Sequence, residues 1–356
     1  MKKLLILILC LLLCGCAKAE PESRDSVTLW YVEGQELRGL ERLVIEYNSK
    51  RPAGILPVSL RSFPHEQSLA AAFEQVRPDL LLCSEHKAEQ LYSQDLLRSL
   101  EAEMPDYSEG IKSAFEYEGE FYFPVGTALQ VLVEREELFQ KSELQNLELF
   151  CKAAVEYSKE RGEAAFTADD FSVLFCHALM TMDTEFHADI SVDKNSERFR
   201  YLYNMLTQSI MEGALLSAPY SSADIMASRA LPYAFADSKS LVGLNGVNVY
   251  AAPAFQSSLS YPASCLGLAV TAAKGRDMES VASFVNYVNQ ESSALALKSG
   301  LAPAVLSDAI GESSLEKCLL EIGAYYNPCF PAQNSDYERN RLSFDAVFRN
   351  TINRLY

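Results

Sequence analysis

The sequence is poor in the residues on which nucleic-acid binding and most catalytic sites depend. Its 356 residues include 4 histidines and 1 tryptophan, and 31 lysines and arginines stand against 48 aspartates and glutamates. The net charge of −17 is spread along the chain without a basic block, whereas nucleic-acid binding requires a clustered positive surface. Nucleic acid is therefore excluded as a partner. The acidity itself does not define a ligand, because acidic surfaces mainly serve solubility.

The chain also lacks the short motifs of common catalytic centres. It contains no Gly-x-Ser-x-Gly elbow, no glycine-rich phosphate loop and no His-Glu-x-x-His sequence. Cys83-x-x-His86 and the adjacent Cys176-His177 have metal-like spacing, but each lacks a second half, and a structural zinc ion needs four ligands. The sequence thus predicts no metal, no cofactor and a protein that is not an enzyme.

One apolar run lies at the N-terminus and is too short for a stable membrane-spanning helix. Lys2 and Lys3 precede apolar residues from Leu4 to Leu13, whereas a spanning helix needs about 20 apolar residues. A basic start, a short apolar run and small residues after it are the layout of a secretory signal. Later apolar stretches do not reach spanning length, so the rest of the chain is expected to be soluble.

The segment Leu13-Cys14-Gly15-Cys16 resembles a lipobox. The resemblance implies a lipoprotein signal over residues 1–16, with Cys16 lipidated as the first mature residue, followed by a polar tether over 17–25. Two acyl chains such as palmitate then hold the protein stably at a membrane. We expect a lipid-anchored, extracytoplasmic protein in the periplasm or at the cell surface. A cleaved signal with an incidental cysteine is the alternative.

Six further cysteines remain in the mature chain. Most lie inside apolar runs, which favours buried free thiols, although an even number outside the cytoplasm also permits disulfides. Cys318 and Cys329, separated by a short loop, are the pair most open to bridging. The disulfide state stays open for all six: Cys83, Cys151, Cys176, Cys265, Cys318 and Cys329.

Alternating strand and helix patterns predict an α/β fold. About 340 mature residues exceed the size at which one core usually stops growing, so two lobes are expected. The expected order begins with a strand at 26–31, a helix at 37–47, a strand at 54–63, a helix at 68–75, a strand at 80–83 and a helix at 85–97. It continues with strands before and after residues 124–127, helices at 147–159, 171–181 and 197–211, strands at 231–235, 247–252 and 265–271, a helix at 278–289 and a helical tail from Ser343.

Several stretches in this order resemble the extracellular solute-binding proteins of ATP-driven (ABC) importers, in the cluster that includes maltodextrin and other sugar binders. The landmarks are Val27-Thr28-Leu29-Trp30, Arg77-Pro78-Asp79-Leu80, Ser93 to Leu100, Tyr122 to Thr127 with Glu137-Leu138-Phe139, Leu266 to Val270, Val281 to Tyr287 and Ser299 to Val305. No single motif is diagnostic, but their order and spacing together are a strong signal.

The resemblance implies a two-lobed, type II-like periplasmic-binding-protein fold, in which each lobe is a β-sheet flanked by helices and hinge strands join the lobes. It places residues 26–126 and 253–310 in the first lobe and residues 127–252 and 311–356 in the second. A ligand touching both lobes would stabilise the closed state. The expected partners are a small solute, most favourably a carbohydrate, and ABC permease subunits, with the protein itself a monomer.

The resemblance also assigns ligand residues by position. They are Trp30, Tyr31, Glu33, Ser84, Glu85, His86, Thr127, Asp170, Phe171, Tyr233 and Tyr337. Aromatic faces would stack on sugar rings, and carboxylates and hydroxyls would bond ring hydroxyls.

Alternatives remain for several of these residues and for the function. Trp30 and Tyr233 fit core packing as well, Asp170 fits a helix N-terminus, and His86 fits an ordinary surface position. The single tryptophan, and Cys83 where relatives use an aromatic residue, leave room for a polyamine or another non-sugar solute. A non-transport lipoprotein that reuses the fold is the other alternative.

Overall fold

The computed structural model describes residues 25–114, 121–182, 197–216, 221–228, 230–255, 260–273, 277–305 and 309–329. The lipidation site Cys16, most of the tether, Tyr337 and the helix expected from Ser343 lie outside these ranges.

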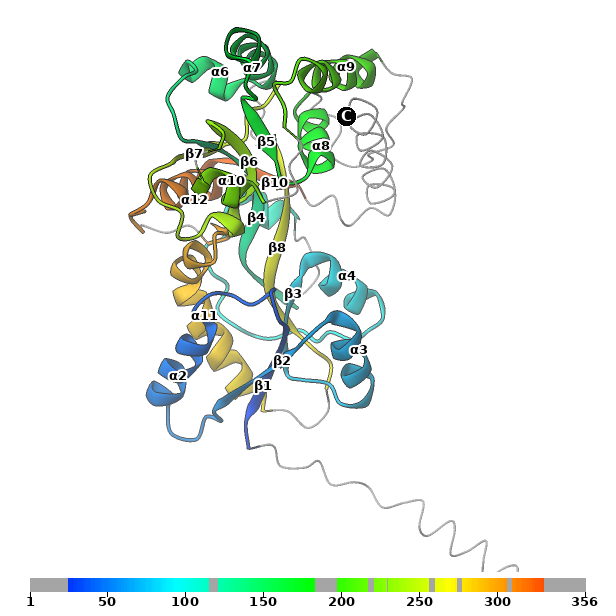
Figure 1. Ribbon diagram of the computed structural model, residues 1–356. Coiled ribbons are helices and arrows are strands. Elements are labelled where there is room, and N and C mark those ends of the chain that lie inside the picture. The colour runs from blue at the N-terminus through cyan, green and yellow to red at the C-terminus, as the bar shows by residue number, and fades with distance from the viewer. Residues whose placement is uncertain are drawn as a thin grey trace, which may run out of the picture.

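Two lobes lie one above the other and are joined by long strands (Figure 1). The lower lobe contains most of the N-terminal elements and a later helix. Its elements are β1 (Val27–Val32), α2 (Leu40–Lys50), β2 (Val58–Phe63), α3 (Glu66–Gln75), β3 (Leu80–Ser84), α4 (Glu85–Ser93) and α11 (Met278–Lys298). The short helix α5 (Glu109–Ala114) lies at the junction, where Gly110 packs against Asn327 and Pro328.

The upper lobe contains the middle of the chain (Figure 1). Its elements are α6 (Lys141–Gln145), α7 (Leu147–Arg161), β5 (Phe166–Ala168), α8 (Phe171–Met182), α9 (Glu197–Met211), α10 (Ser222–Ser228), β6 (Tyr233–Asp237), the short 3-10 helix η1 (Ser238–Leu241) and β7 (Asn248–Ala251). Beside the junction lie β9 (Ala302–Pro303), α12 (Ser314–Tyr325) and β10 (Asn327–Cys329).

Two strands cross between the lobes, β4 (Tyr122–Glu134) and β8 (Ser260–Val270). Within the described ranges one continuous sheet has the strand order β2-β1-β3-β8-β4-β6-β5, with β7, β9 and β10 pairing off this path. The first half of β4 pairs with β8, and its second half pairs with β6 and β7. Each lobe is therefore built from chain segments far apart in sequence.

Helices cover both faces of the sheet and bury separate apolar cores. In the lower lobe α2 and α11 cover one face, and α3 and α4 cover the other. In the upper lobe α7, α8 and α9 bury an aromatic cluster around Phe150 and Phe235. In these helices the buried residues recur every three or four positions, which is the apolar pattern that predicts helices from the sequence.

The α/β fold class and the two-lobed architecture are confirmed, and one element differs. A break around Pro124-Val125-Gly126-Thr127 was expected between two strands, but β4 runs through it as a single strand of 13 residues. A register shift between Pro124 and Gly126 absorbs the proline, which cannot donate to the ladder. The crossing segment is thus a strand that belongs to both lobes.

The contacts of residues 253 and 254 indicate where the chain returns from the second lobe to the first. The Pro253 carbonyl accepts from His177 Nε2 at 3.1 Å, and the Ala254 amide donates to the Gln145 carbonyl at 3.3 Å. Both partners belong to the second lobe, although residue 253 was expected to open the second part of the first lobe. These contacts favour a return crossing within β8.

Candidate functional site

The carboxyl ends of the parallel strands of both lobes point toward the same junction. In the first lobe β1, β2 and β3 are mutually parallel, and β3 is antiparallel to β8. In the second lobe β5 and β6 are parallel, and β6 is antiparallel to β4, which is itself antiparallel to β8. It follows that the strands of the two lobes run toward each other. Ligands of open α/β sheets bind beyond such carboxyl ends.

At the first-lobe side of the junction, β3 leads directly into α4. Ser84 caps this helix, since its hydroxyl accepts from the Lys87 amide at 3.4 Å. Glu85 begins the helix and is only 1 % exposed. One of its carboxylate oxygens, Oε2, accepts from the Cys265 amide of β8 at 2.8 Å, while Oε1 is buried without a partner.

The surroundings of Glu85 are apolar enough to change its ionisation. Burial raises the pKa of Glu85 from 4.5 to about 7, against the opposing effect of its backbone hydrogen bonds. Nearby, the Tyr122 hydroxyl lies 3.1 Å from the Cys83 carbonyl and 3.3 Å from the Cys265 carbonyl, so it ties β4 to both β3 and β8. A protonatable carboxyl group therefore sits beside the crossing strands.

At the second-lobe side, Asp169 and Asp170 follow β5, and Asp237 is the last residue of β6. The Asp169 carboxylate accepts from the Ser222 amide at 2.6 Å and from the Asp237 amide at 3.0 Å. Asp170 caps α8, because its Oδ1 accepts from the Ser172 amide at 2.8 Å and from the Val173 amide at 3.3 Å. Asp237 caps η1 through the Lys239 amide at 2.8 Å.

Asp237 combines solvent access with a perturbed ionisation. Its side chain is exposed, yet desolvation by the surrounding protein raises its pKa, and the neighbouring Asp169 carboxylate adds to that rise. Asp237 is therefore a solvent-accessible carboxyl group at the junction. Such groups accept hydrogen bonds from hydroxyl or ammonium donors.

Solved structures share this architecture at low sequence identity. The cyclic alpha-maltosyl-1,6-maltose binding protein of Arthrobacter globiformis superposes with a TM-score of 0.68 and 14 % identity, over 93 % of this chain and 94 % of that one. The GacH receptor of Streptomyces glaucescens gives 0.68 and 15 %, over 94 % and 95 %. The ABC substrate-binding protein Lmo0181 of Listeria monocytogenes gives 0.69 and 14 %, over 93 % and 94 %.

The chain has the fold of the ABC substrate-binding proteins. The likeness extends over almost the whole length on both sides, so neither lobe is an unrelated addition. These neighbours are described as binding proteins and a receptor rather than as enzymes. No protein-family model and no curated protein matches the sequence.

Three residues assigned to the ligand are core residues in this substrate-binding fold. Trp30 is buried, with the Phe63 ring 4.9 Å and the Arg61 guanidinium 4.9 Å from its own ring. Tyr31 is buried on the opposite face of the sheet, in the core under α2 and α11. Their faces are occupied by protein, so neither presents an aromatic surface to a solute.

Tyr233, the third of these residues, also belongs to the core and not to a ligand site. It is 0 % exposed and stacks on Phe139 with ring centroids 4.4 Å apart. Its hydroxyl accepts from the amides of Leu138 and Phe139 and donates to Glu134 at 3.2 Å. Tyr233 lies at the start of β6, whereas the junction lies at its end, which explains why this ring belongs to the core.

The other assigned residues in the described ranges lie at or near the junction. Glu33 follows β1, is exposed and accepts from the Ser62 hydroxyl at 3.2 Å. His86 is half-buried, and its Nε2 lies 2.8 Å from Gln90 Nε2. Thr127 is buried in β4, with its hydroxyl 3.2 Å from that of Tyr261. Phe171, half-buried, packs against the α7–α9 core beside Asp170.

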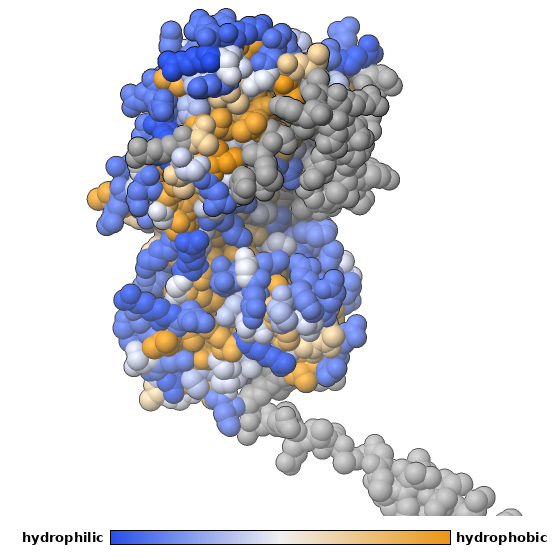
Figure 2. Space-filling view, in the orientation of Figure 1, coloured by the Kyte–Doolittle hydropathy of each residue, from blue (hydrophilic) through white to orange (hydrophobic). Residues whose placement is uncertain are grey.

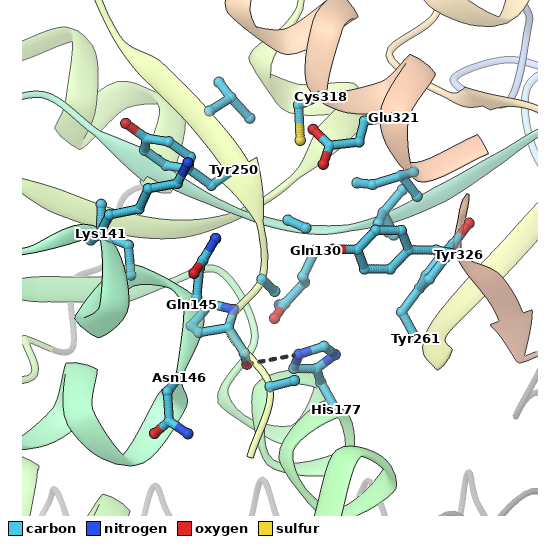
Figure 3. Close-up of a pocket in the computed structure, with 18 of the residues that line it drawn as sticks. Gln130, Lys141, Gln145, Asn146, His177, Tyr250, Tyr261, Cys318, Glu321 and Tyr326 are labelled. Atoms are coloured by element: carbon cyan, nitrogen blue, oxygen red, sulfur yellow. Dashed lines mark hydrogen bonds between the residues drawn. The ribbon is translucent and has the colours of Figure 1, made fainter. Parts of the chain in front are cut away.

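A cavity of about 820 Å³ lies on the second-lobe side of the crossing strands (Figure 3). Its walls come from β4, α6 with the following Asn146, α8, the segment from β7 to Phe255, β8, and α12 with the following Tyr326. None of the ligand residues assigned from the sequence lines it. Two of them contact its walls, Thr127 through Tyr261 and Asp170 through Gln130.

Four cysteine side chains that the structure describes are buried and form no disulfide. They are Cys83, Cys151, Cys265 and Cys318, so the bridge considered for Cys318 is not formed. Within the part of the chain that the structure describes, no group of three or more His, Cys, Asp or Glu side chains is arranged to hold a metal ion. In the same ranges no helix has the length and apolar character needed to cross a membrane.

Proposed function

We propose that the chain is the substrate-binding lipoprotein of an ABC importer, which captures a small polar solute, most favourably a carbohydrate, between its lobes and delivers it to permease subunits. The observation that carries this proposal is the convergence of strand ends from both lobes, with accessible carboxylates at the junction. The fold is shared with proteins described as binding cyclic maltosyl-maltose and cycloalternan.

The proposed binding residues come from both lobes. The first lobe and the crossing strand contribute Glu33, Ser84, Glu85, His86 and Thr127, and the second contributes Asp170 and Phe171, with Tyr337 added from outside the described residues. To these we add Asp169 and Asp237, which the strand ends place beside Asp170. A solute bonded to both lobes stabilises their closed arrangement by its differential affinity for it.

The lipid anchor on Cys16 and the extracytoplasmic location are part of the same proposal. Because the acyl chains supply the membrane affinity, a Cys16→Ser variant should appear in the soluble fraction, while the unaltered chain stays with membranes. Cell fractionation with labelled palmitate measures both outcomes. Membrane retention of an unlabelled Cys16→Ser protein would refute the anchor and leave the binding function untouched.

A thermal-shift screen tests the binding function. Maltose, xylobiose, glucose, spermidine, amino acids and divalent cations are tested separately, since a ligand that binds the native state raises the melting temperature by mass action. We expect a saccharide to do so. Asp237→Asn keeps the cap of η1 but removes the charge, and should weaken the response about tenfold in concentration.

The matched control is Glu163→Gln, which removes an exposed carboxylate before β5, at the end of the second lobe away from the junction. A saccharide response unchanged in Asp237→Asn would refute the proposed site. A response to spermidine alone would assign the carboxylates to an amine-bearing solute. A response to no member of the panel would favour a lipoprotein that reuses the fold without transport.

A further inference from the structure

The cavity beside the crossing strands has a buried polar atom that the protein leaves unpaired. Gln130 lines this cavity from β4 and is 9 % exposed. Its amide nitrogen donates to the Asp170 carbonyl at 3.2 Å, but its side-chain oxygen is buried without a hydrogen-bond partner. Buried acceptors are almost always paired. The missing partner of this oxygen is therefore expected to be a donor of a molecule bound in the cavity.

The other buried polar groups around Gln130 are already used by the protein. The His177 Nε2 donates to the Pro253 carbonyl at 3.1 Å, and burial lowers the pKa of this histidine, so the ring is neutral. The Tyr261 hydroxyl contacts Thr127, and the Tyr250 hydroxyl donates to Glu134 at 2.7 Å. These groups are held by internal hydrogen bonds, whereas the buried Gln130 side-chain oxygen has no partner.

Aromatic rings stand on two sides of this position. Figure 3 shows Tyr250 on one side of Gln130 and the rings of Tyr261 and Tyr326 on the other. The centroids of Tyr261 and Tyr326 are 6.1 Å apart at an interplanar angle of 58°. At the rim, Lys141 and Lys317 are accompanied by Glu321, so charges of both signs are present.

We infer that this cavity is a second small-molecule site, which takes an uncharged polyhydroxylated ring of the size of a monosaccharide. A ring hydroxyl would donate to Gln130, and the apolar faces of the ring would pack on the tyrosines. The volume of about 820 Å³ is typical of sites that enclose small organic ligands. The inference goes beyond the proposed transport site and does not depend on it, since no residue assigned to that site lines the cavity.

The location gives this second site a connection to the hinge. Its walls include Gln130 of β4 and Tyr261 of β8, the two strands that join the lobes. Gln130 also holds the backbone of Asp170, at the start of α8. A ligand here would contact both crossing strands at once, without lying between the lobes.

The test uses the full mature chain and three probes, glucose, maltose and myo-inositol, in saturation-transfer NMR and titration calorimetry. Tyr326→Ala removes a half-buried wall of the cavity, and Gln130→Leu removes the unpaired acceptor. We expect either change to weaken one binding event by at least about tenfold. Tyr325→Ala, which truncates an exposed neighbour that does not line the cavity, is the matched control and should bind as the unaltered chain does.

Asp237→Asn separates this site from the proposed transport site. The inference requires that Asp237→Asn retains the event that Tyr326→Ala loses. Loss of all binding in Asp237→Asn, with none lost in Tyr326→Ala, would overturn the second site and support the junction alone. Absence of binding by all three probes at about 10 mM would also overturn it. Equal losses in Tyr325→Ala and Tyr326→Ala would do the same, because they would show a general effect on α12.

Discussion

Replacing Glu85 with glutamine should remove roughly 3 kcal/mol of the pH dependence of folding stability between about pH 4 and pH 8. Glu85 has an ordinary pKa of 4.5, which burial raises to about 7 in the folded protein. The folded state therefore holds this proton over a range in which the unfolded chain has released it. The contribution of Glu85 to the free energy of unfolding is fully present below about pH 4.5 and is lost as the pH rises toward 7.

Urea unfolding of the unaltered chain and of Glu85→Gln, measured across this range, gives the difference directly. Stability of the unaltered chain should fall relative to the variant as the pH rises. Glutamine can still accept from the Cys265 amide, so the contact between α4 and β8 is kept. Because only the pH-dependent part is compared, a constant cost of the substitution does not affect the result. Parallel stability curves would show that Glu85 is not desolvated in solution.

Gly300→Ala should lower the free energy of unfolding by about 2–4 kcal/mol. Gly300 follows α11 with a φ of +71°, and a Cβ atom there would lie 2.6 Å from the Ser238 carbonyl and 2.8 Å from Lys239 Cα. Ser238 and Lys239 belong to η1, directly after the strand that ends at Asp237. The backbone of η1 in the second lobe thus packs closely against the C-terminal end of α11 in the first lobe. Because the nearest atoms are backbone atoms, they cannot move aside as a flexible side chain can.

Gly162→Ala is the control for the backbone conformation. Gly162 ends α7 with a φ of +69°, but nothing lies within 4 Å of its added Cβ. It should cost only about 1 kcal/mol, the strain of a left-handed alanine. The difference between the two variants measures the contact between the lobes. Equal costs in urea unfolding would mean that the approach at Gly300 is not maintained in solution.

Most of the fold could be predicted because its elements carry strong periodic patterns. The apolar run at Leu80–Cys83 and the stripe at Glu197–Met211 were placed correctly from the sequence alone. Helix α12 was not predicted, although Ser313 and Glu316 form a capping box and Leu315, Leu319 and Ile322 form a helical stripe. The signal for this helix, which forms one wall of the cavity, was present in the sequence.

The candidate site could be predicted only in part. Local sequence places Ser84, Glu85 and Asp170 at strand ends, but it does not tell a buried aromatic residue from one that faces a ligand. Trp30 and Tyr233 lie within apolar strands whose two faces are both covered by helices, which fixes them in the core. Asp237 was missed because its place beside Asp169 depends on the pairing of β5 with β6.

Small-angle X-ray scattering of the full mature chain, with and without a saturating saccharide from the panel, tests most directly whether the two lobes close on a solute. Figure 2 shows the narrowing between the lobes across which this movement would occur. The radius of gyration should fall when the saccharide is added to the unaltered chain, and the same fall should need about tenfold more saccharide for Asp237→Asn. A saccharide that raises the melting temperature but leaves the scattering curve unchanged would contradict capture by lobe closure.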